Sequence, residues 1–157
     1  MTIKITAVGK TDDPQLIAML NLYHSRLQHY NKVEFEIIPD IKNSKNLTEN
    51  RQKQKEGELI LKKIKPADIV ILLDEKGREF TSKNFSEFIQ KKLNSGKKQL
   101  VFVIGGPYGF SEEVQLRANQ KIALSKMTFS HQMVRLFFLE QLYRAFTILR
   151  NEPYHHE

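Results

Sequence analysis

The stretch Leu100-Val101-Phe102-Val103-Ile104-Gly105-Gly106-Pro107-Tyr108-Gly109 decides the fold, because five apolar residues pass directly into glycines. A continuous apolar run of this length is typical of a strand that is covered on both faces, as in a parallel sheet. Glycines at the end of such a strand let a ligand approach the backbone, since no Cβ stands in the way. A tight turn without a ligand is the alternative that a Gly-Gly-Pro segment also fits.

Strands and helices alternate on both sides of this stretch. The other predicted strands are Ile3–Val8, Val33–Ile38, Asp68–Leu73 and Lys121–Leu124. Helices are expected from Pro14 to Leu27, from Thr48 to just before Pro66, from Ser82 to Ser95, after Ser111, and from about His131 to Arg150. The alternation predicts one α/β domain over residues 1–157, with a mainly parallel sheet and helices on both faces.

Two segments are predicted to lie at the carboxyl ends of buried strands, where open α/β sheets bind ligands. They are Asp74–Gly77 and Gly105–Gly109. Neither contains the Gly-Lys-Ser/Thr of a phosphate-binding loop or the spacing of a dinucleotide fingerprint. An enzyme that uses NAD is therefore disfavoured.

Composition excludes several classes of protein. The 157 residues contain no cysteine and carry a formal net charge of +7. Without cysteine there is no disulfide framework, thiolate nucleophile or zinc ribbon, and we expect no metal site. A basic surface attracts polyanions such as nucleic acid, although positive charge also serves solubility alone. The most apolar stretch, Met133–Leu149, is interrupted by charged residues, so no membrane span is expected.

The last predicted helix is apolar around nearly its whole circumference. Its apolar residues are Met133, Leu136, Phe137, Leu139, Leu142, Phe146, Ile148 and Leu149. Such a helix must be covered on every side, and a short chain has little material to cover it. We therefore expect a homodimer, with a central core helix in a monomer as the alternative.

Polar residues gather near both ends of that helix. His131 and Arg135 lie four apart on one face at its start, where a helix N-terminus favours anions, although a solvated cap explains them equally well. Arg144 follows Glu140 by one turn and is expected to form a structural ion pair with it. The tail ends in Pro153-Tyr154-His155-His156-Glu157, which is either a frayed polar end or a source of stacking and proton-transfer groups.

Several motifs together resemble a known family. They are Val103–Phe110, Leu124–Arg135, Glu140–Ala145 and Pro153–His155, and the likeness extends from Ile5–Lys10 through Lys55–Gly57 to the tail. In this order and spacing the chain resembles the bacterial SPOUT methyltransferases that act on N3 of a pseudouridine in 23S ribosomal RNA. It departs from the family motif at Ser130, where the family has proline.

The resemblance implies a knotted SPOUT fold, in which the C-terminal segment threads through a loop and forms a pocket for S-adenosylmethionine. It also implies a cytoplasmic homodimer whose partner is 23S rRNA or the assembled ribosome, rather than DNA. The expected cofactor-binding residues are Leu73, Gly105, Leu124, Ser125, Lys126, Met127, Thr128 and Phe129.

N3 of a pseudouridine is an imide nitrogen that becomes a good nucleophile only when it loses its proton. We hypothesise that His131, Arg135, Tyr154 and His155 form the polar site that handles this step, with the tail coming from the other subunit. Arg135 would hold a phosphate or the developing anion, Tyr154 would stack on or orient the base, and either histidine would manage the proton. Lysines of the second helix would bind the RNA backbone. The competing hypothesis is a non-enzymatic ribosome-binding or RNA-binding factor.

Overall fold

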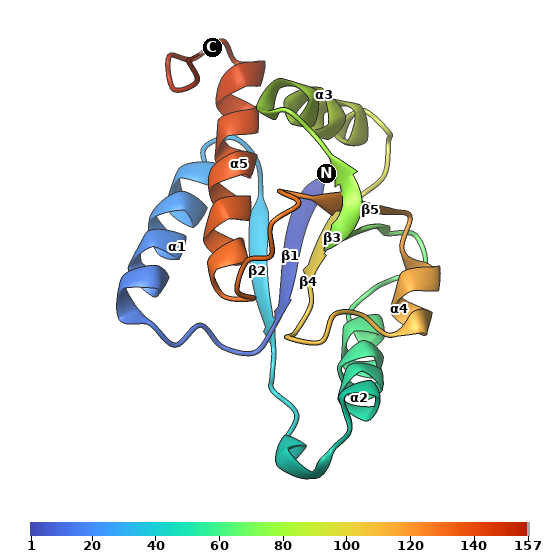
Figure 1. Cartoon of the computed structure of the whole chain (residues 1–157). Coiled ribbons are helices and arrows are strands. Elements are labelled where there is room, and N and C mark those ends of the chain that lie inside the picture. The colour runs from blue at the N-terminus through green and yellow to red at the C-terminus, as the bar shows by residue number, and fades with distance from the viewer. Residues whose placement is uncertain (157) are drawn as a thin grey trace.

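The computed structural model describes residues 1–156, so Glu157, the last residue of the predicted tail, lies outside the described residues. Five strands form one sheet in the order β2-β1-β4-β3-β5, and every pairing is parallel (Figure 1). They span Thr2–Val8 (β1), Val33–Ile38 (β2), Ile69–Glu79 (β3), Gln99–Ile104 (β4) and Gln120–Ala123 (β5). The prediction of a mainly parallel α/β sheet is confirmed.

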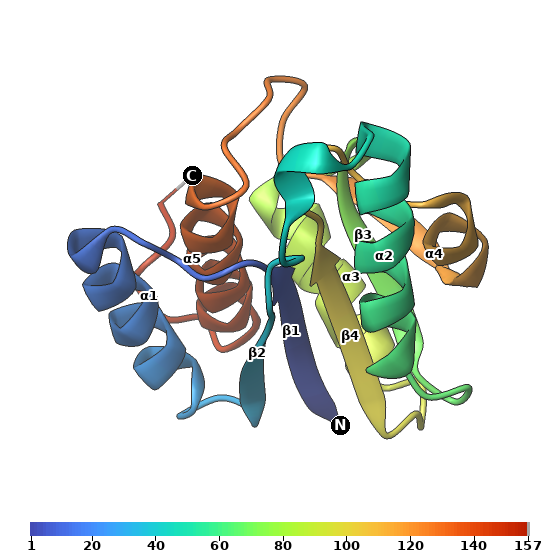
Figure 2. The same cartoon turned by 90° about the horizontal axis from the view of Figure 1, so that it is seen from below.

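Four α-helices connect the strands, namely α1 (Pro14–Leu27), α2 (Glu49–Lys62), α3 (Ser82–Leu93) and α4 (Glu112–Arg117), and a fifth, α5 (Met133–Leu149), follows β5. A short 3₁₀ helix, η1 (Ser44–Asn46), precedes α2. Figure 2 shows α1 and α5 on one side of the central strands and α2 and α4 on the other. α5 packs between α1 and α3.

Two hydrophobic cores fill the space between the sheet and these helices. Along β4, Leu100, Phe102 and Ile104 face the core with α1, α3 and α5, whereas Val101 and Val103 face the core with α2 and α4. This alternation follows from the pleat of a strand, which points successive side chains to opposite faces. All five residues are buried, which explains why the run is apolar without interruption.

Side-chain caps set where four of the helices begin. Asp13, Thr48, Thr81 and Ser111 each accept a hydrogen bond from a backbone N–H in the first turn of the helix that follows. Such caps satisfy N–H groups that have no partner within the helix. The predicted starts at Thr48 and Ser111 are confirmed as capping residues.

The predicted end of the third strand at Leu73 is wrong, because β3 resumes beyond it and ends at Glu79. Leu73 and Arg78 both pair with Ile122 of β5, so the residues between them form a bulge. A Cβ built on Gly77 would lie 2.5 Å from the backbone carbon of Ile122, which leaves room only for glycine. The polar residues of this bulge concealed the continuation of the strand in the sequence.

Gly77→Ala is expected to lower the free energy of unfolding by about 1–3 kcal/mol, since its methyl group would overlap the β5 backbone. Urea denaturation followed by circular dichroism measures this change. Lys76→Ala is the matched control, because Lys76 is exposed in the same bulge. Equal stability of the two variants would contradict the close packing of β3 on β5.

Candidate functional site

A pocket of about 620 Å³ opens at the β3 bulge and at the ends of β4 and β5. Three segments supply most of its wall: the β3 bulge, the loop 105–110 after β4, and the segment 124–131 after β5. Its size falls within the range of small-molecule and cofactor sites. It also lies at the carboxyl edge of a parallel sheet, which is where ligands bind in open α/β folds.

Seven of the eight residues expected to hold a cofactor line this one pocket. They are Leu73, Gly105, Leu124, Ser125, Met127, Thr128 and Phe129, and His131 lines it as well. Lys126 does not line the pocket and is exposed to solvent, so the structure separates it from its neighbours. The pocket thus brings together expected residues that are up to 58 positions apart in the chain, from Leu73 to His131.

Gly105 and Gly106 form a cradle of bare backbone in the pocket wall. A Cβ on Gly105 would lie 3.1 Å from the Phe110 ring, and a Cβ on Gly106 would lie 2.7 Å from the Glu56 carboxylate. Both glycines have ordinary φ values, so close packing and not backbone strain explains their identity. Without side chains at these two positions, a ligand can approach the backbone of this wall closely.

Charged side chains of both signs line the rest of the pocket. The acidic ones are Glu49, Asp74 and Glu75, and the basic ones are Lys53, Lys76 and Lys121. Glu49 and Lys53 come from α2 and were not expected at the site, since their sequence pattern is that of an ordinary solvated helix face. The mixture of charges suits a ligand that carries an amino group and a carboxylate together.

Hydrogen bonds hold the segment after β5 in place. Thr128 Oγ1 donates to Glu75 Oε2 at 2.7 Å, which ties this segment to the β3 bulge. Within the segment, the Met127 N–H donates to Ser125 Oγ at 2.9 Å. The Phe129 ring packs against Phe137 of α5 with ring centroids 4.9 Å apart. The pocket wall is therefore anchored to both the sheet and the last helix.

Ser130 caps the start of α5. Its Oγ accepts a hydrogen bond from the Met133 N–H at 3.1 Å, and its carbonyl accepts from the Val134 N–H. His131 lies in the turn that follows, so the helix begins at Met133 and not at His131 as predicted. The chain therefore enters α5 through a capped turn at the position where the family motif has proline.

Arg135 is fully buried. Its guanidinium donates to the carbonyl oxygens of Val8 at 2.6 Å and Gly9 at 2.8 Å, and to Thr11 Oγ1 at 2.9 Å. Its Nε donates to the His131 carbonyl at 3.1 Å. The expected contact of Arg135 with a phosphate or developing anion does not fit this geometry, because protein oxygens occupy its donors and no part of it faces solvent.

The surroundings of Arg135 act on its pKa in opposite directions. Burial lowers the pKa of Arg135, while the nearby carboxylates of Asp40 and Asp12 raise it. Asp12 also exchanges two hydrogen bonds with Gln132, at 3.0 Å and 2.8 Å. The loop after β1 is thus fastened to the start of α5 from both sides, which fixes the His131 backbone at the pocket edge.

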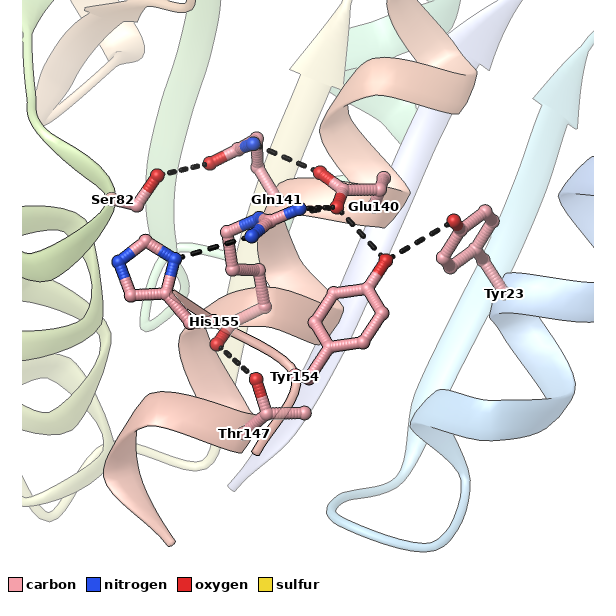
Figure 3. Close-up of polar contacts among 8 residues, drawn as sticks. Tyr23, Ser82, Glu140, Gln141, Thr147, Tyr154 and His155 are labelled. Atoms are coloured by element: carbon pink, nitrogen blue, oxygen red, sulfur yellow. Dashed lines mark hydrogen bonds and ion pairs between the residues drawn. The ribbon is translucent and has the colours of Figure 1, made fainter. Parts of the chain in front are cut away.

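The predicted ion pair between Glu140 and Arg144 is present, and the tail joins it in one network (Figure 3). Glu140 Oε1 accepts from Arg144 at 2.5 Å and from the Tyr154 hydroxyl at 3.0 Å. The Tyr154 hydroxyl also lies 3.3 Å from the Tyr23 hydroxyl, within hydrogen-bond distance, and His155 Nδ1 lies 3.1 Å from the Arg144 guanidinium. Burial raises the pKa of Tyr154, and the bonds to Tyr23 and Glu140 add to this effect.

A single chain does not bring the four predicted polar residues together. Glu140, to which Tyr154 is bonded, lies seven residues after Met133, about 10 Å further along the helix axis than the pocket end of α5. Figure 1 shows the described tail segment that follows α5 beyond the end of that helix at Leu149. His131 therefore borders the pocket of its own chain, whereas Tyr154 and His155 occupy a separate polar cluster.

No group of three or more His, Cys, Asp or Glu side chains among residues 1–156 could hold a metal ion. Over the same residues, no helix has both the length and the apolar character that crossing a membrane requires. The candidate site therefore consists of the pocket and of the polar cluster that Glu140, Arg144, Tyr154 and His155 form on α5.

Each comparison with known proteins covers most of the chain. The family described as "Predicted SPOUT methyltransferase" matches residues 1–155. Two relatives are named "Ribosomal RNA large subunit methyltransferase H": one from Christiangramia forsetii is 68% identical over 99% of both chains, and one from Flavobacterium johnsoniae is 64% identical over 100% of both. A solved structure, that of a probable methyltransferase from Bordetella pertussis Tohama I, has a similar fold, with a TM-score of 0.57 over 92% of this chain and 93% of that chain at 6% identity.

Replacing Arg135 with methionine is expected to lower the free energy of unfolding by about 2–4 kcal/mol, because the Val8 and Gly9 carbonyls lose their buried donor. Chemical denaturation measures this loss. Arg51→Met is the control, since Arg51 is exposed on α2. If Arg135→Met were as stable as the control and lost only RNA binding, Arg135 would be a phosphate ligand and not a structural residue.

Proposed function

Since the chain belongs to the SPOUT methyltransferase family, we propose that it transfers the methyl group of S-adenosylmethionine to N3 of a pseudouridine in 23S ribosomal RNA. The observation that carries this proposal is the pocket of about 620 Å³, which collects the expected cofactor-binding segments at the carboxyl edge of the sheet. The names of the relatives support the substrate class, a large-subunit ribosomal RNA.

The residues around the pocket fit the methyl donor. The bare backbone of Gly105 and Gly106 would take the nucleoside, and the mixed charges at Glu49, Lys53 and Asp74 would take its amino-acid end. When bound, S-adenosylmethionine supplies an activated methyl group on a sulfonium. The task of the chain is therefore to align the nucleophile with that methyl group and to exclude water.

His131 is the group of this chain best placed to manage the proton of the nucleophile. His131 lines the pocket, and its backbone is fixed by Arg135 and by the Asp12–Gln132 pair. Imidazole exchanges protons near neutral pH, which suits an imide nitrogen that must be deprotonated. Arg135 then acts as a positioning residue, because it is fully buried and contacts the His131 carbonyl.

Tyr154 and His155 complete the site only if they come from a second copy of the chain. Within one chain they lie along α5, away from the pocket. We propose a homodimer in which the tail of each protomer supplies the pocket of its partner. Exposed apolar residues on the two helices that would form the interface support a dimer: Ile17, Met19 and Leu22 on α1, and Met133 and Phe137 on α5.

The proposed substrate also accounts for the positive charge of the chain. A net charge of +7 favours binding to the RNA backbone, and the lysines of α2 would contribute contacts. The proposal places the enzyme in the cytoplasm, with the ribosome as its partner. The knotted path of the C-terminal segment stays a prediction from the family. A non-enzymatic RNA-binding factor is the second candidate, and it would have no use for a pocket that fits the methyl donor.

Gly105→Trp is expected to abolish both the binding of S-adenosylmethionine and methyl transfer, because an indole at this position would fill the pocket. Calorimetric titration measures binding, and transfer of labelled methyl groups to unmodified 23S rRNA or ribosomes measures activity. Leu116→Trp adds the same bulk on the exposed face of α4, away from the pocket, and should change neither. RNA binding by a wild-type protein that takes up no methyl donor, even with ribosomes present, would favour the non-enzymatic factor.

Mixing two inactive variants tests whether the tail acts in trans. One variant lacks residues 153–157 and the other carries Gly105→Trp. If the tail completes the partner's pocket, random mixing after dissociation should restore about a quarter of the wild-type activity, because half of the dimers hold one intact site. No recovery in confirmed mixed dimers would place the tail in the pocket of its own chain, and full activity of the shortened variant alone would remove any catalytic role of the tail.

A further inference from the structure

Glu56 of α2 is a buried carboxylate that the reaction described above does not use. Its side chain is 3% exposed, although carboxylates are seldom buried without a charged partner. Oε1 accepts a hydrogen bond from Gln52 at 3.0 Å, while Oε2 has no hydrogen-bond partner among the described residues. An uncompensated buried oxygen of this kind lowers stability, so its presence calls for a functional explanation.

The carboxylate lies directly behind the wall of the pocket. A Cβ on Gly106 would be 2.7 Å from Oε2 and 3.0 Å from Oε1, so one backbone segment separates Glu56 from the pocket that Gly106 lines. The absence of a side chain at Gly106 is what allows this approach. A charge at this depth acts strongly on a ligand, because little water screens it.

Among residues 1–156, no cationic side chain forms an ion pair with Glu56. Burial raises the pKa of Glu56, the Gln52 hydrogen bond lowers it, and the nearby Asp40 carboxylate raises it. Lys53 precedes it on α2 and lines the pocket, but it makes no ion pair with Glu56 in the described part of the chain. A positive charge that entered the pocket would therefore meet an unpaired acidic group.

We infer that Glu56 distinguishes the cationic methyl donor from the neutral product by supplying a negative charge behind Gly106. This inference rests on the proposed function. S-adenosylmethionine and S-adenosylhomocysteine share the nucleoside, the amino group and the carboxylate, and they differ in the methylsulfonium of the donor. After transfer the sulfur is a neutral thioether, so the attraction to Glu56 ends when the reaction is complete. Glu56 acts through the loop, which makes it a positioning residue.

A change in proton binding accompanies this attraction. The sulfonium favours the ionised carboxylate, so the Glu56 carboxyl releases a proton to solvent when the donor binds. The neutral product does not favour the ionised form, and the carboxyl takes the proton back. Glu56 thereby tightens binding of the donor without tightening binding of the product, which favours replacement of the spent product by a new donor.

Calorimetric titration of the full chain with S-adenosylmethionine and with S-adenosylhomocysteine, between about pH 5 and pH 8, tests this inference. Glu56→Gln is expected to weaken binding of the donor about tenfold and to leave binding of the product unchanged. Glu58→Gln is the matched control, since it removes the same charge from an exposed position on α2, and it should affect neither ligand. Equal weakening of both ligands by Glu56→Gln would reduce Glu56 to a structural residue and overturn the inference.

The wild-type protein provides a second measurement that does not depend on the folding of a variant. Titrations in two buffers of different ionisation enthalpy count the protons released, and the donor should release more than the product at one or more pH values in this range. Equal proton counts across the range would overturn the inference while leaving the proposed function intact. Absence of donor binding to the wild-type chain, with or without ribosomes, would instead overturn the proposed function and the inference with it.

Discussion

The hydrogen bonds from Arg135 to the end of β1 are the contacts on which the site most depends. Arg135 lies in the first turn of α5. Its guanidinium bonds the Gly9 carbonyl, 126 positions earlier in the chain, and the Val8 carbonyl, 127 positions earlier. An arginine can reach several backbone oxygens at once because its guanidinium presents its donors as a rigid fork. Burial makes these bonds strong and makes their loss costly. The first strand and the last helix are thereby held as one unit, with the pocket segment 124–131 entering α5 beside them.

Much of the fold could be predicted from the sequence because its signals are local. Uninterrupted apolar runs predicted β3 and β4, and capping residues such as Thr48 and Ser111 predicted helix starts. The β3 bulge could not be predicted, since its polar residues have the composition of a loop. Its strand pairing depends on the close approach of Gly77 to Ile122, which is a contact between distant parts of the chain.

The location of the pocket could be predicted from the sequence, but the surroundings of all the predicted polar residues could not. The carboxyl-edge rule and the family resemblance both indicated the loops after β3, β4 and β5. The burial of Arg135 could not be predicted, because spacing along a helix says which residues share a face and not whether that face is buried. For the same reason α5, although apolar nearly all round, is covered largely by α1, α3 and the sheet, and leaves only Met133 and Phe137 strongly exposed.

The position of Phe137 shows why dimerisation and cofactor binding should be coupled in this fold. Phe137 is 40% exposed on α5, and its ring packs on Phe129 in the pocket wall. Covering Phe137 with a second chain would restrict Phe129, and would thereby order the segment that lines the pocket. An ordered pocket loses less conformational entropy when it binds a ligand, so the dimer should bind the methyl donor more tightly than the monomer. Reciprocity then requires that the methyl donor stabilise the dimer.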